Sequence, residues 1–319
     1  MPPDPPPAAA PDAPLGGAAA ARTPEQRALL QLVIASLCFG LMAFAAKLAA
    51  GRGLGGAQVA AVRFAFGLLP VALLPGIRRR ALAWERRDLL LYRGVFGGTA
   101  VLLYFLAIEH VTVGLATLLN YTSPVFAVLF ASLFIGEKVQ ARVLPALAAA
   151  LLGVFLVVRA GAAPGELRVT GPWVAAGLLS AILSGAALTA IRMARRTEGS
   201  WAIYTSFNGI GLALTLPPAL LAWRAPDPVA TAALLGVGVA SMAAQLLMTH
   251  AYRWVDNLRA GVVSQLAVFV AMALGVSLLG DRVTPLALLG SLLTVAGVVA
   301  VVAARSPSVP VAATEPPEP

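Results

Sequence analysis

The sequence predicts an all-α membrane protein with ten transmembrane helices, arranged as two inverted five-helix repeats. Three observations support this prediction: a low content of charged residues, ten apolar runs of membrane-spanning length, and a weak internal repeat. Of the 319 residues, 59% are hydrophobic and only 12% are charged, whereas a soluble domain carries roughly 25% charged residues. So few charges cannot cover a water-exposed surface, and we therefore expect most of the surface to contact lipid.

The apolar runs occupy most of the chain. A helix needs about 20 apolar residues to cross the hydrocarbon layer. Glycine and proline inside such runs are tolerated in membrane helices. Runs of this size lie near residues 28–50, 57–76, 88–108, 111–135, 142–158, 172–194, 201–222, 229–252, 258–279 and 284–304.

The composition also divides the chain into units. Residues 1–27 and 305–319 are rich in proline and alanine, so they cannot bury a core and are expected to be disordered tails. Between them we expect a first five-helix unit at 28–158, a linker at 159–171 and a second unit at 172–304. The chain starts without the basic segment of a secretory signal, so the first apolar run should remain as a membrane anchor.

The basic residues predict the orientation. The formal net charge is +9, but the arginines are mostly confined to short segments between apolar runs, which is typical of membrane loops and argues against nucleic-acid binding. If the N-terminus is cytoplasmic, most basic residues fall on the cytoplasmic side, as the positive-inside rule requires. The opposite side then holds only Arg52, Arg159, Arg168, Arg224 and Arg282. We therefore predict a multi-pass protein of the bacterial inner membrane with both termini in the cytoplasm.

The acidic residues and the motifs exclude several function classes. Every Asp and Glu, Glu109 and Asp281 included, lies at the end of a run, in a loop or in a tail. No carboxylate in the middle of a run is available as a proton relay, and no cluster could hold a metal ion. No Gly-Lys-Ser/Thr phosphate loop occurs, so we expect no cofactor and no ATP hydrolysis. The single Cys38 excludes an internal disulfide.

An internal repeat relates the two halves. A shift of 144 positions places Gly136-Glu137-Lys138 on Gly280-Asp281-Arg282, and Gly153-Val154 on Gly297-Val298. Because five is an odd number, two consecutive five-helix units must cross the membrane in opposite senses. Inverted repeats of this kind are typical of secondary transporters, whose substrate site lies between the halves.

The first half also resembles a known family. The segments that carry the resemblance are Tyr92-Arg93-Gly94, Tyr104-Phe105-Leu106-Ala107, Asn120-Tyr121-Thr122-Ser123-Pro124 and Gly136-Glu137-Lys138. They resemble the EamA domain of the drug/metabolite transporter superfamily, and two such domains would cover residues 28–304. In the second half Val268 replaces Pro124 and Gln265 replaces Tyr121. The resemblance implies a ten-helix exporter or exchanger of small metabolites, with a cavity lined by the first four spans of each half.

Polar side chains inside the apolar runs are the candidates for substrate contact. Charged side chains inside lipid are costly and are usually functional. Arg63 and Arg93 could attract a carboxylate or phosphate, but Arg93 and Lys47 could also extend to the nearer interface. The uncharged candidates could bond a substrate or a neighbouring helix. The candidate substrate-binding residues are Arg63, Arg93, Tyr104, Asn120, Tyr121, Ser123, Asn208, Gln245 and Gln265.

These observations predict a secondary transporter that exports small polar or zwitterionic, amino-acid-like metabolites by alternating access. Its partners would be a small-molecule substrate and the lipid bilayer. The fifth and tenth spans could form the interface of a homodimer, or each could pack against its own half. The sequence leaves both alternatives open. The alternatives are a membrane-embedded sensor or scaffold, which would carry a sizeable soluble module, and a lipid-modifying enzyme, which would carry a catalytic cluster.

Overall fold

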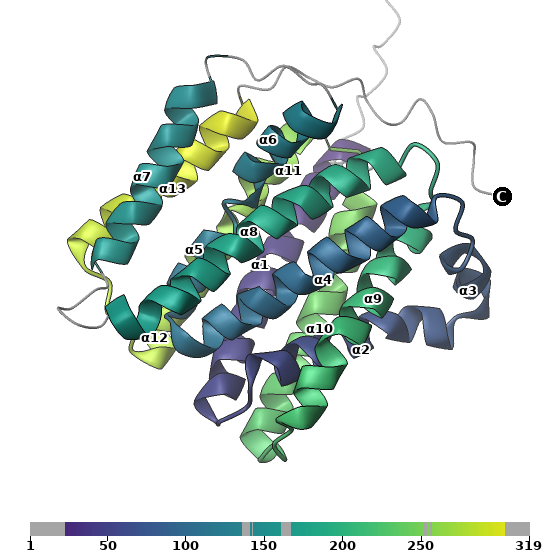
Figure 1. Cartoon of the computed structure of the whole chain (residues 1–319), viewed down its shortest axis with the longest axis horizontal. Helices are drawn as coiled ribbons and strands as arrows, with labels where there is room; N and C mark the ends of the chain where they lie inside the picture. Colours follow the sequence, from purple (N-terminus) through teal and green to yellow (C-terminus); the bar gives the residue numbers. More distant parts are fainter. Residues whose placement is uncertain are drawn as a thin grey trace, which may run out of the picture.

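The computed structural model describes residues 23–135, 141, 143–160, 167–251, 254–255 and 257–303. Within this part of the chain every regular element is an α-helix and there is no strand, so the prediction of an all-α protein is confirmed. Figure 1 shows the arrangement of the helices. They are α1 (Pro24–Gly51), α2 (Gly56–Leu73), α3 (Pro75–Ala81), α4 (Arg87–His110), α5 (Val113–Asn120), α6 (Ser123–Ile135), α7 (Val143–Ala160), α8 (Leu167–Ala194), α9 (Ser200–Leu221), α10 (Pro228–Ala251), α11 (Asn257–Ser264), α12 (Leu266–Leu279) and α13 (Pro285–Ala303).

Each predicted apolar run coincides with one helix or with two consecutive helices. Eight segments of the described chain are long and apolar enough to cross a membrane: α1, α2, α4, α5 with most of α6, α7, most of α8, most of α10, and most of α11 with α12. The helix α13 is apolar over 285–301. The helix α9 has 22 residues and carries the polar side chains Thr205, Ser206 and Asn208 in its first half.

The outer surface of this helical bundle is apolar. Large hydrophobic side chains such as Leu133, Leu221 and Phe155 are 74%, 91% and 58% exposed. Exposed apolar side chains on so many helices would be unfavourable in water, and in a bilayer they contact lipid tails. The protein is therefore a multi-pass membrane protein.

The helices differ from the predicted runs at the start of α1, after α2 and on both sides of the predicted linker. The helix α1 begins at Pro24 rather than at residue 28, because Thr23 and Gln26 form a capping box and proline suits the first helical position. Residues 24–27 therefore belong to a helix and not to the N-terminal tail. Pro75 begins the additional basic helix α3. The predicted linker is shortened on both sides, because α7 extends to Ala160 and α8 begins at Leu167.

The fourth and ninth predicted runs are each broken near the middle of the bundle. The first break separates α5 from α6 at Tyr121 and Thr122, where Pro124 lies in the first turn of α6 and cannot donate a backbone hydrogen bond. The second break separates α11 from α12 at Gln265. The Gln265 amide donates to the backbone oxygen of Tyr121 at 3.4 Å. The two breaks, which are 144 positions apart in the sequence, are therefore in contact.

Small residues allow close contacts between neighbouring helices. The helices α7 and α13 pack side by side at one edge of the bundle (Figure 1). Gly153 of α7 faces Gly290 of α13, and Gly297 of α13 faces Ala146 of α7, with no space for a larger side chain at either glycine. Gly280 ends α12 with a φ of 74°, a left-handed conformation that favours glycine. Its repeat partner Gly136 lies outside the described residues.

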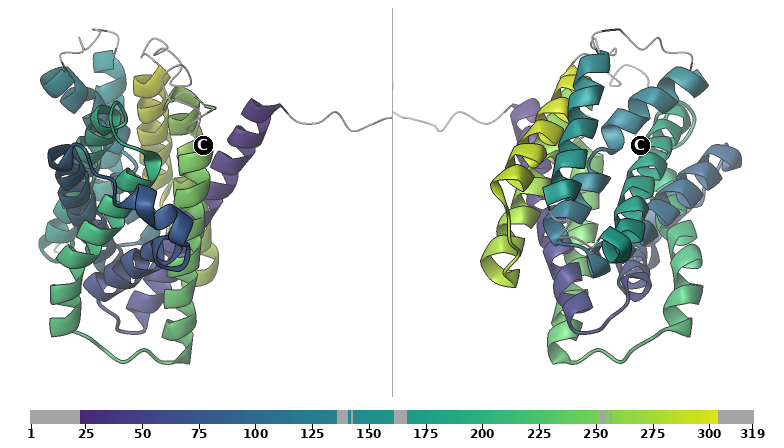
Figure 2. Two further views of the ribbon diagram at one scale, coloured as in Figure 1. Left: turned by 90° about the vertical axis from the view of Figure 1, so that its right-hand side faces the viewer. Right: turned by 60° about the vertical axis from the view of Figure 1, so that its left-hand side comes forward.

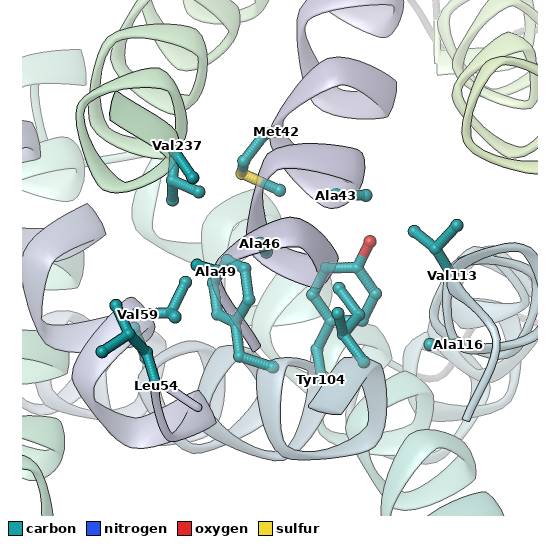
Figure 3. Close-up of a cluster of buried hydrophobic side chains, with 14 of the residues drawn as sticks. Met42, Ala43, Ala46, Ala49, Leu54, Val59, Tyr104, Val113, Ala116 and Val237 are labelled. Carbon is teal, nitrogen blue, oxygen red and sulfur yellow. The ribbon is translucent and has the colours of Figure 1, made fainter. Parts of the chain in front are cut away.

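The helix α1 lies at the centre of the main buried cluster. Its alanines Ala43, Ala46 and Ala49 face residues of α2, α4, α5 and α10. Figure 3 shows Tyr104 of α4 among these side chains, beside Val113 of α5. Small side chains on α1 thus bring the helices that carry the candidate site close together.

Polar contacts connect the helices at both ends of the bundle. At one end, where the α1–α2 and α9–α10 connections lie (Figure 2), the Gln58 side chain exchanges two hydrogen bonds with the Arg224 backbone, and Arg52 pairs with Asp227 at 3.2 Å. At the other end, the Glu198 carboxylate accepts hydrogen bonds from the backbone N–H groups of residues 85 and 86, just before α4. These contacts fix the positions of α2, α4 and α9.

Candidate functional site

The centre of the candidate site is a pair of buried arginines. Arg63 of α2 and Arg93 of α4 are 6% and 7% exposed. Arg63 lies about 10 Å from the start of α2 and Arg93 about 9 Å from the start of α4, at 1.5 Å per residue. Arg93 therefore turns into the bundle and does not extend to the interface.

Both guanidinium groups lie against the same aromatic ring. The Cζ atom of Arg93 is 3.8 Å and that of Arg63 is 5.3 Å from the centre of the Phe207 ring on α9. Arg63 is also 5.0 Å from the ring of Phe64, which meets Phe207 edge to face. Cation–π contacts of this kind stabilise a desolvated guanidinium by about 2 kcal/mol. Because both Cζ atoms lie within these distances of the centre of the same Phe207 ring, they are at most about 9 Å apart.

These two charges have no acidic partner among the residues that the structure describes. The buried atoms Nε and Nη1 of Arg63 and Nε of Arg93 make no hydrogen bond. A buried donor without an acceptor costs about 1–3 kcal/mol, and more when it is charged. Arginine presents its donors in a planar fork that suits carboxylate and phosphate oxygens. The arrangement can thus hold an anion that enters the bundle.

Glycines on α4 and α9 make space for this arrangement. On α4, Gly94 faces the Ile210 side chain and Gly98 faces the backbone of Gly211 on α9. The Arg93 guanidinium lies directly over Gly97 and occupies the space that a β-carbon at position 97 would fill. The sequence Gly94-x-x-Gly97-Gly98 therefore lets α9 approach α4 closely, which places Phe207 against both arginines.

Hydroxyl groups surround Arg63. The hydroxyls of Tyr104, Tyr121 and Tyr204 lie close enough to interact with its charge. Tyr104 shares a hydrogen bond of 3.0 Å with Thr117 of α5. The buried hydroxyls of Tyr204 and Thr205 have no partner in the described chain. The Tyr204 hydroxyl is therefore available to a substrate together with the guanidinium groups.

Asn208 and Asn120 bond to protein groups. Asn208 is 3% exposed, donates to the Tyr204 backbone oxygen at 2.9 Å and packs against Gly67 of α2. The Asn120 amide donates to Ser180 of α8 at 2.6 Å. For Asn120 the structure therefore shows the helix–helix bond that the sequence left as the alternative to substrate contact.

Of the remaining predicted residues, Ser123 and Gln265 lie at the helix breaks and Gln245 lies on α10. Gln265 contacts Tyr121 at the two breaks, as described above. Ser123 begins α6 and Gln245 lies in the second half of α10, both half-buried. Lys47 also points into the bundle, where its ammonium group donates to the backbone oxygens of Ile108 and Val111 at 2.9 and 2.8 Å. It thus stabilises the end of α4, where the helix dipole favours a positive charge.

The sequence analysis missed the aromatic part of the site. Phe64, Tyr204 and Phe207 were not predicted as functional, because isolated aromatic residues in apolar runs are usually part of the core. One signal was present: Phe64 follows Arg63 directly, and Tyr204 and Phe207 are three residues apart, so they share one helix face with the buried part of α9. Ser206, by contrast, bonds to its own helix through the Ile203 oxygen.

Comparisons with known proteins agree with this architecture. The model of the EamA-like transporter family matches residues 26–159 and 171–303. The chain is 31% identical over 230 residues to the pseudopaline exporter of Pseudomonas aeruginosa, which covers 70% of this chain and 78% of the relative. It is 31% identical over 259 residues to a probable terminal-alkyne amino-acid exporter of Streptantibioticus cattleyicolor, covering 78% of this chain and 84% of the relative.

A solved structure supports the fold. Its title is "Crystal structure of protein", it superposes with a TM-score of 0.61 at 20% identity, and the match covers 87% of this chain and 96% of that one. The two family matches together span nearly all of the described residues and fall on the two predicted five-helix units. The chain therefore belongs to the EamA-like transporter family.

Proposed function

We propose that this protein exports a small polar or zwitterionic, amino-acid-like metabolite across the bacterial inner membrane by alternating access. Membership of a transporter family supports transport, and two similar proteins are named as exporters, one of pseudopaline and one of a terminal-alkyne amino acid. The observation that carries the proposal is the pair of buried arginines whose donors have no acceptor in the described chain. A substrate carboxylate would supply the missing acceptor.

The ten helical segments would form two inverted five-helix repeats that rock against each other. The helix contacts support this proposal, because each contact between the halves recurs when every helix is replaced by its counterpart in the other half. The contact of α1 with α10 corresponds to that of α8 with α4, and the contact of α4 with α9 to that of α10 with α2. The contact of α6 with α8 corresponds to that of α12 with α1. Single residues follow the same rule. Gly40 of α1 packs against Val270, and Gly185 of α8 packs against Phe126, 144 positions before Val270.

The substrate site would lie between the halves, near the Phe207 ring. Arg63 and Arg93 would bind the acidic group, and Tyr104, Tyr121 and Asn208 would contact the remainder of the substrate. The broken helices support this position, because interrupted helices commonly form the substrate sites of secondary transporters. Ser123, Gln245 and Gln265 lie on or near the α5–α6 and α10–α12 segments and remain candidate contacts.

The proposed orientation has both termini in the cytoplasm. The basic helix α3, with Arg78, Arg79 and Arg80, would then lie on the cytoplasmic side, in agreement with the positive-inside rule. The variant Arg79→Cys, made together with Cys38→Ala so that it carries a single thiol, should react with an impermeant maleimide only after cells are opened. Labelling of this variant in intact spheroplasts would reverse the orientation.

Transport itself can be tested with the purified full-length protein in liposomes. Liposomes are loaded with labelled amino acids, small carboxylic acids or cationic dyes, and efflux is followed with and without a pH gradient. We expect saturable efflux of an acidic or zwitterionic compound that falls at least tenfold in Arg63→Ala. The matched control is Arg79→Ala, which removes an exposed arginine of α3. Efflux of cationic dyes alone would contradict the proposal.

A further inference from the structure

The charges around Phe207 say more about the substrate than that it is small and polar. Two guanidinium groups lie against one ring, at most about 9 Å apart, and neither has a carboxylate partner in the described chain. Lys47, a further cation of the described bundle, is already bound to the end of α4. A substrate with one carboxylate would leave one of the two arginines uncompensated inside the membrane, where an isolated charge is costly.

We infer that the Arg63–Arg93 pair selects substrates with two carboxylates, each bound by one guanidinium. The inference rests on the proposed function and names the substrate class of the same site. It predicts that transport requires a second acid group on the amino-acid-like substrate, so that neutral amino acids are poor substrates.

The geometry of the pair favours two separate acid groups over a single one. The two guanidinium groups come from different helices, and Phe207 lies between α2 and α4. Each guanidinium carbon lies over an aromatic ring, and the buried N–H donors that make no hydrogen bond in the described chain can bind a planar carboxylate. Two carboxylates separated by two or three carbon atoms are about 4–5 Å apart at 1.5 Å per bond, which matches two guanidinium groups separated by less than about 9 Å.

The surroundings of the pair do not favour a free ammonium group. No Asp or Glu side chain of the described chain pairs with either arginine, and the ring faces of Phe64 and Phe207 are occupied by guanidinium groups. An ammonium on the substrate would therefore need the tyrosine hydroxyls or backbone oxygens. The Tyr204 hydroxyl, which lies near Arg63 and has no partner in the described chain, can donate to a further carboxylate oxygen. This donor-rich environment suits an excess of acid groups.

The test compares ligands that differ by one charge. Purified full-length protein is melted in detergent with glutarate, its monoamide, glutamate, glutamine or phosphoserine, and the concentration that gives half of the maximal stabilisation is measured. We expect glutarate and glutamate to act at concentrations at least tenfold lower than the monoamide and glutamine. Arg63→Gln and Arg93→Gln should each reduce this ratio to about one, whereas Arg79→Gln should leave it unchanged.

Each other outcome has a definite meaning. Equal effects of glutamate and glutamine on the wild-type protein would overturn the inference. A preference for phosphoserine over glutamate by tenfold or more would overturn it too, because the pair would then recognise a phosphate and not two carboxylates. Saturable efflux of neutral amino acids that is insensitive to Arg63→Gln would refute the inference and leave the export function intact. Absence of efflux for every acid and amino acid would instead refute the export function. Arg63→Lys keeps the charge without the planar fork, and should retain a reduced preference for the diacid.

Discussion

Replacing Arg93 by methionine should make the empty protein more stable, although the residue is buried in the centre of the bundle. Methionine is unbranched and flexible, so it can fill most of the volume of the arginine side chain. Most substitutions of a buried residue destabilise a protein. The expected increase in stability therefore distinguishes a binding group from a structural one.

The magnitude follows from three contributions. Two unit charges at the upper limit of about 9 Å repel by about 2 kcal/mol at an effective dielectric constant of about 20. The Nε donor of Arg93 is buried without an acceptor, which costs about 1–3 kcal/mol. The substitution removes both costs, but it also removes the contact of Arg93 with Phe207 at 3.8 Å, worth about 2 kcal/mol. The net result is a stabilisation of about 1–3 kcal/mol.

The assay is thermal unfolding of the purified protein in detergent, without ligand, at neutral pH and moderate salt. Arg93→Met should melt several degrees above the wild type, and glutarate should stabilise the variant far less than the wild type. The matched control is Lys47→Met, because the Lys47 ammonium bonds to backbone oxygens of α4 and the change should lower the melting temperature. A lower melting temperature for Arg93→Met, similar to that of Lys47→Met, would refute the view that Arg93 is uncompensated.

Three further predictions concern the scaffold around the site. Glu198→Ala removes the acceptor for two backbone N–H groups before α4, and should cost about 1–2 kcal/mol of stability, as the loss of a helix cap does; an unchanged melting temperature would contradict this role. Gly153→Leu places a side chain against the Thr294 backbone of α13 and should lower stability by about 1–3 kcal/mol. The ratio of glutarate affinity to monoamide affinity should stay as in the wild type. A changed ratio would mean that α7 and α13 shape the site. Gly97→Ala fills the space under the Arg93 guanidinium and should reduce the ratio of glutarate affinity to monoamide affinity. Little helix stability should be lost, since alanine favours helices. Wild-type selectivity in this variant would show that Arg93 is not held in this position.

The scarcity of charges and the lengths of the apolar runs were sufficient to predict a helical membrane protein. These properties act through simple physical rules: lipid cannot hydrogen-bond the backbone, so each run must form a helix long enough to cross the layer. The break before α6 could also be predicted, because Pro124 cannot continue the backbone hydrogen bonds of α5. The break at Gln265 could not, since the second half has Val268 in place of that proline and only the packing of α11 and α12 reveals it.

The position of each polar side chain was decided by the tertiary structure. The sequence identified Arg63 and Arg93 as unusual, because both lie inside apolar runs, but a long arginine side chain can reach either the interface or the interior. The close approach of α9 to α4 through Gly98 and Gly211 places the Arg93 side chain in the interior. It also brought Phe207, more than 100 residues away in the sequence, against both charges. Asn120 shows the opposite case, since the packing of α8 gives its amide a partner in Ser180. Sequence alone thus determined which residues were costly to bury, and helix packing determined which of them were left without a hydrogen-bond partner in the described chain.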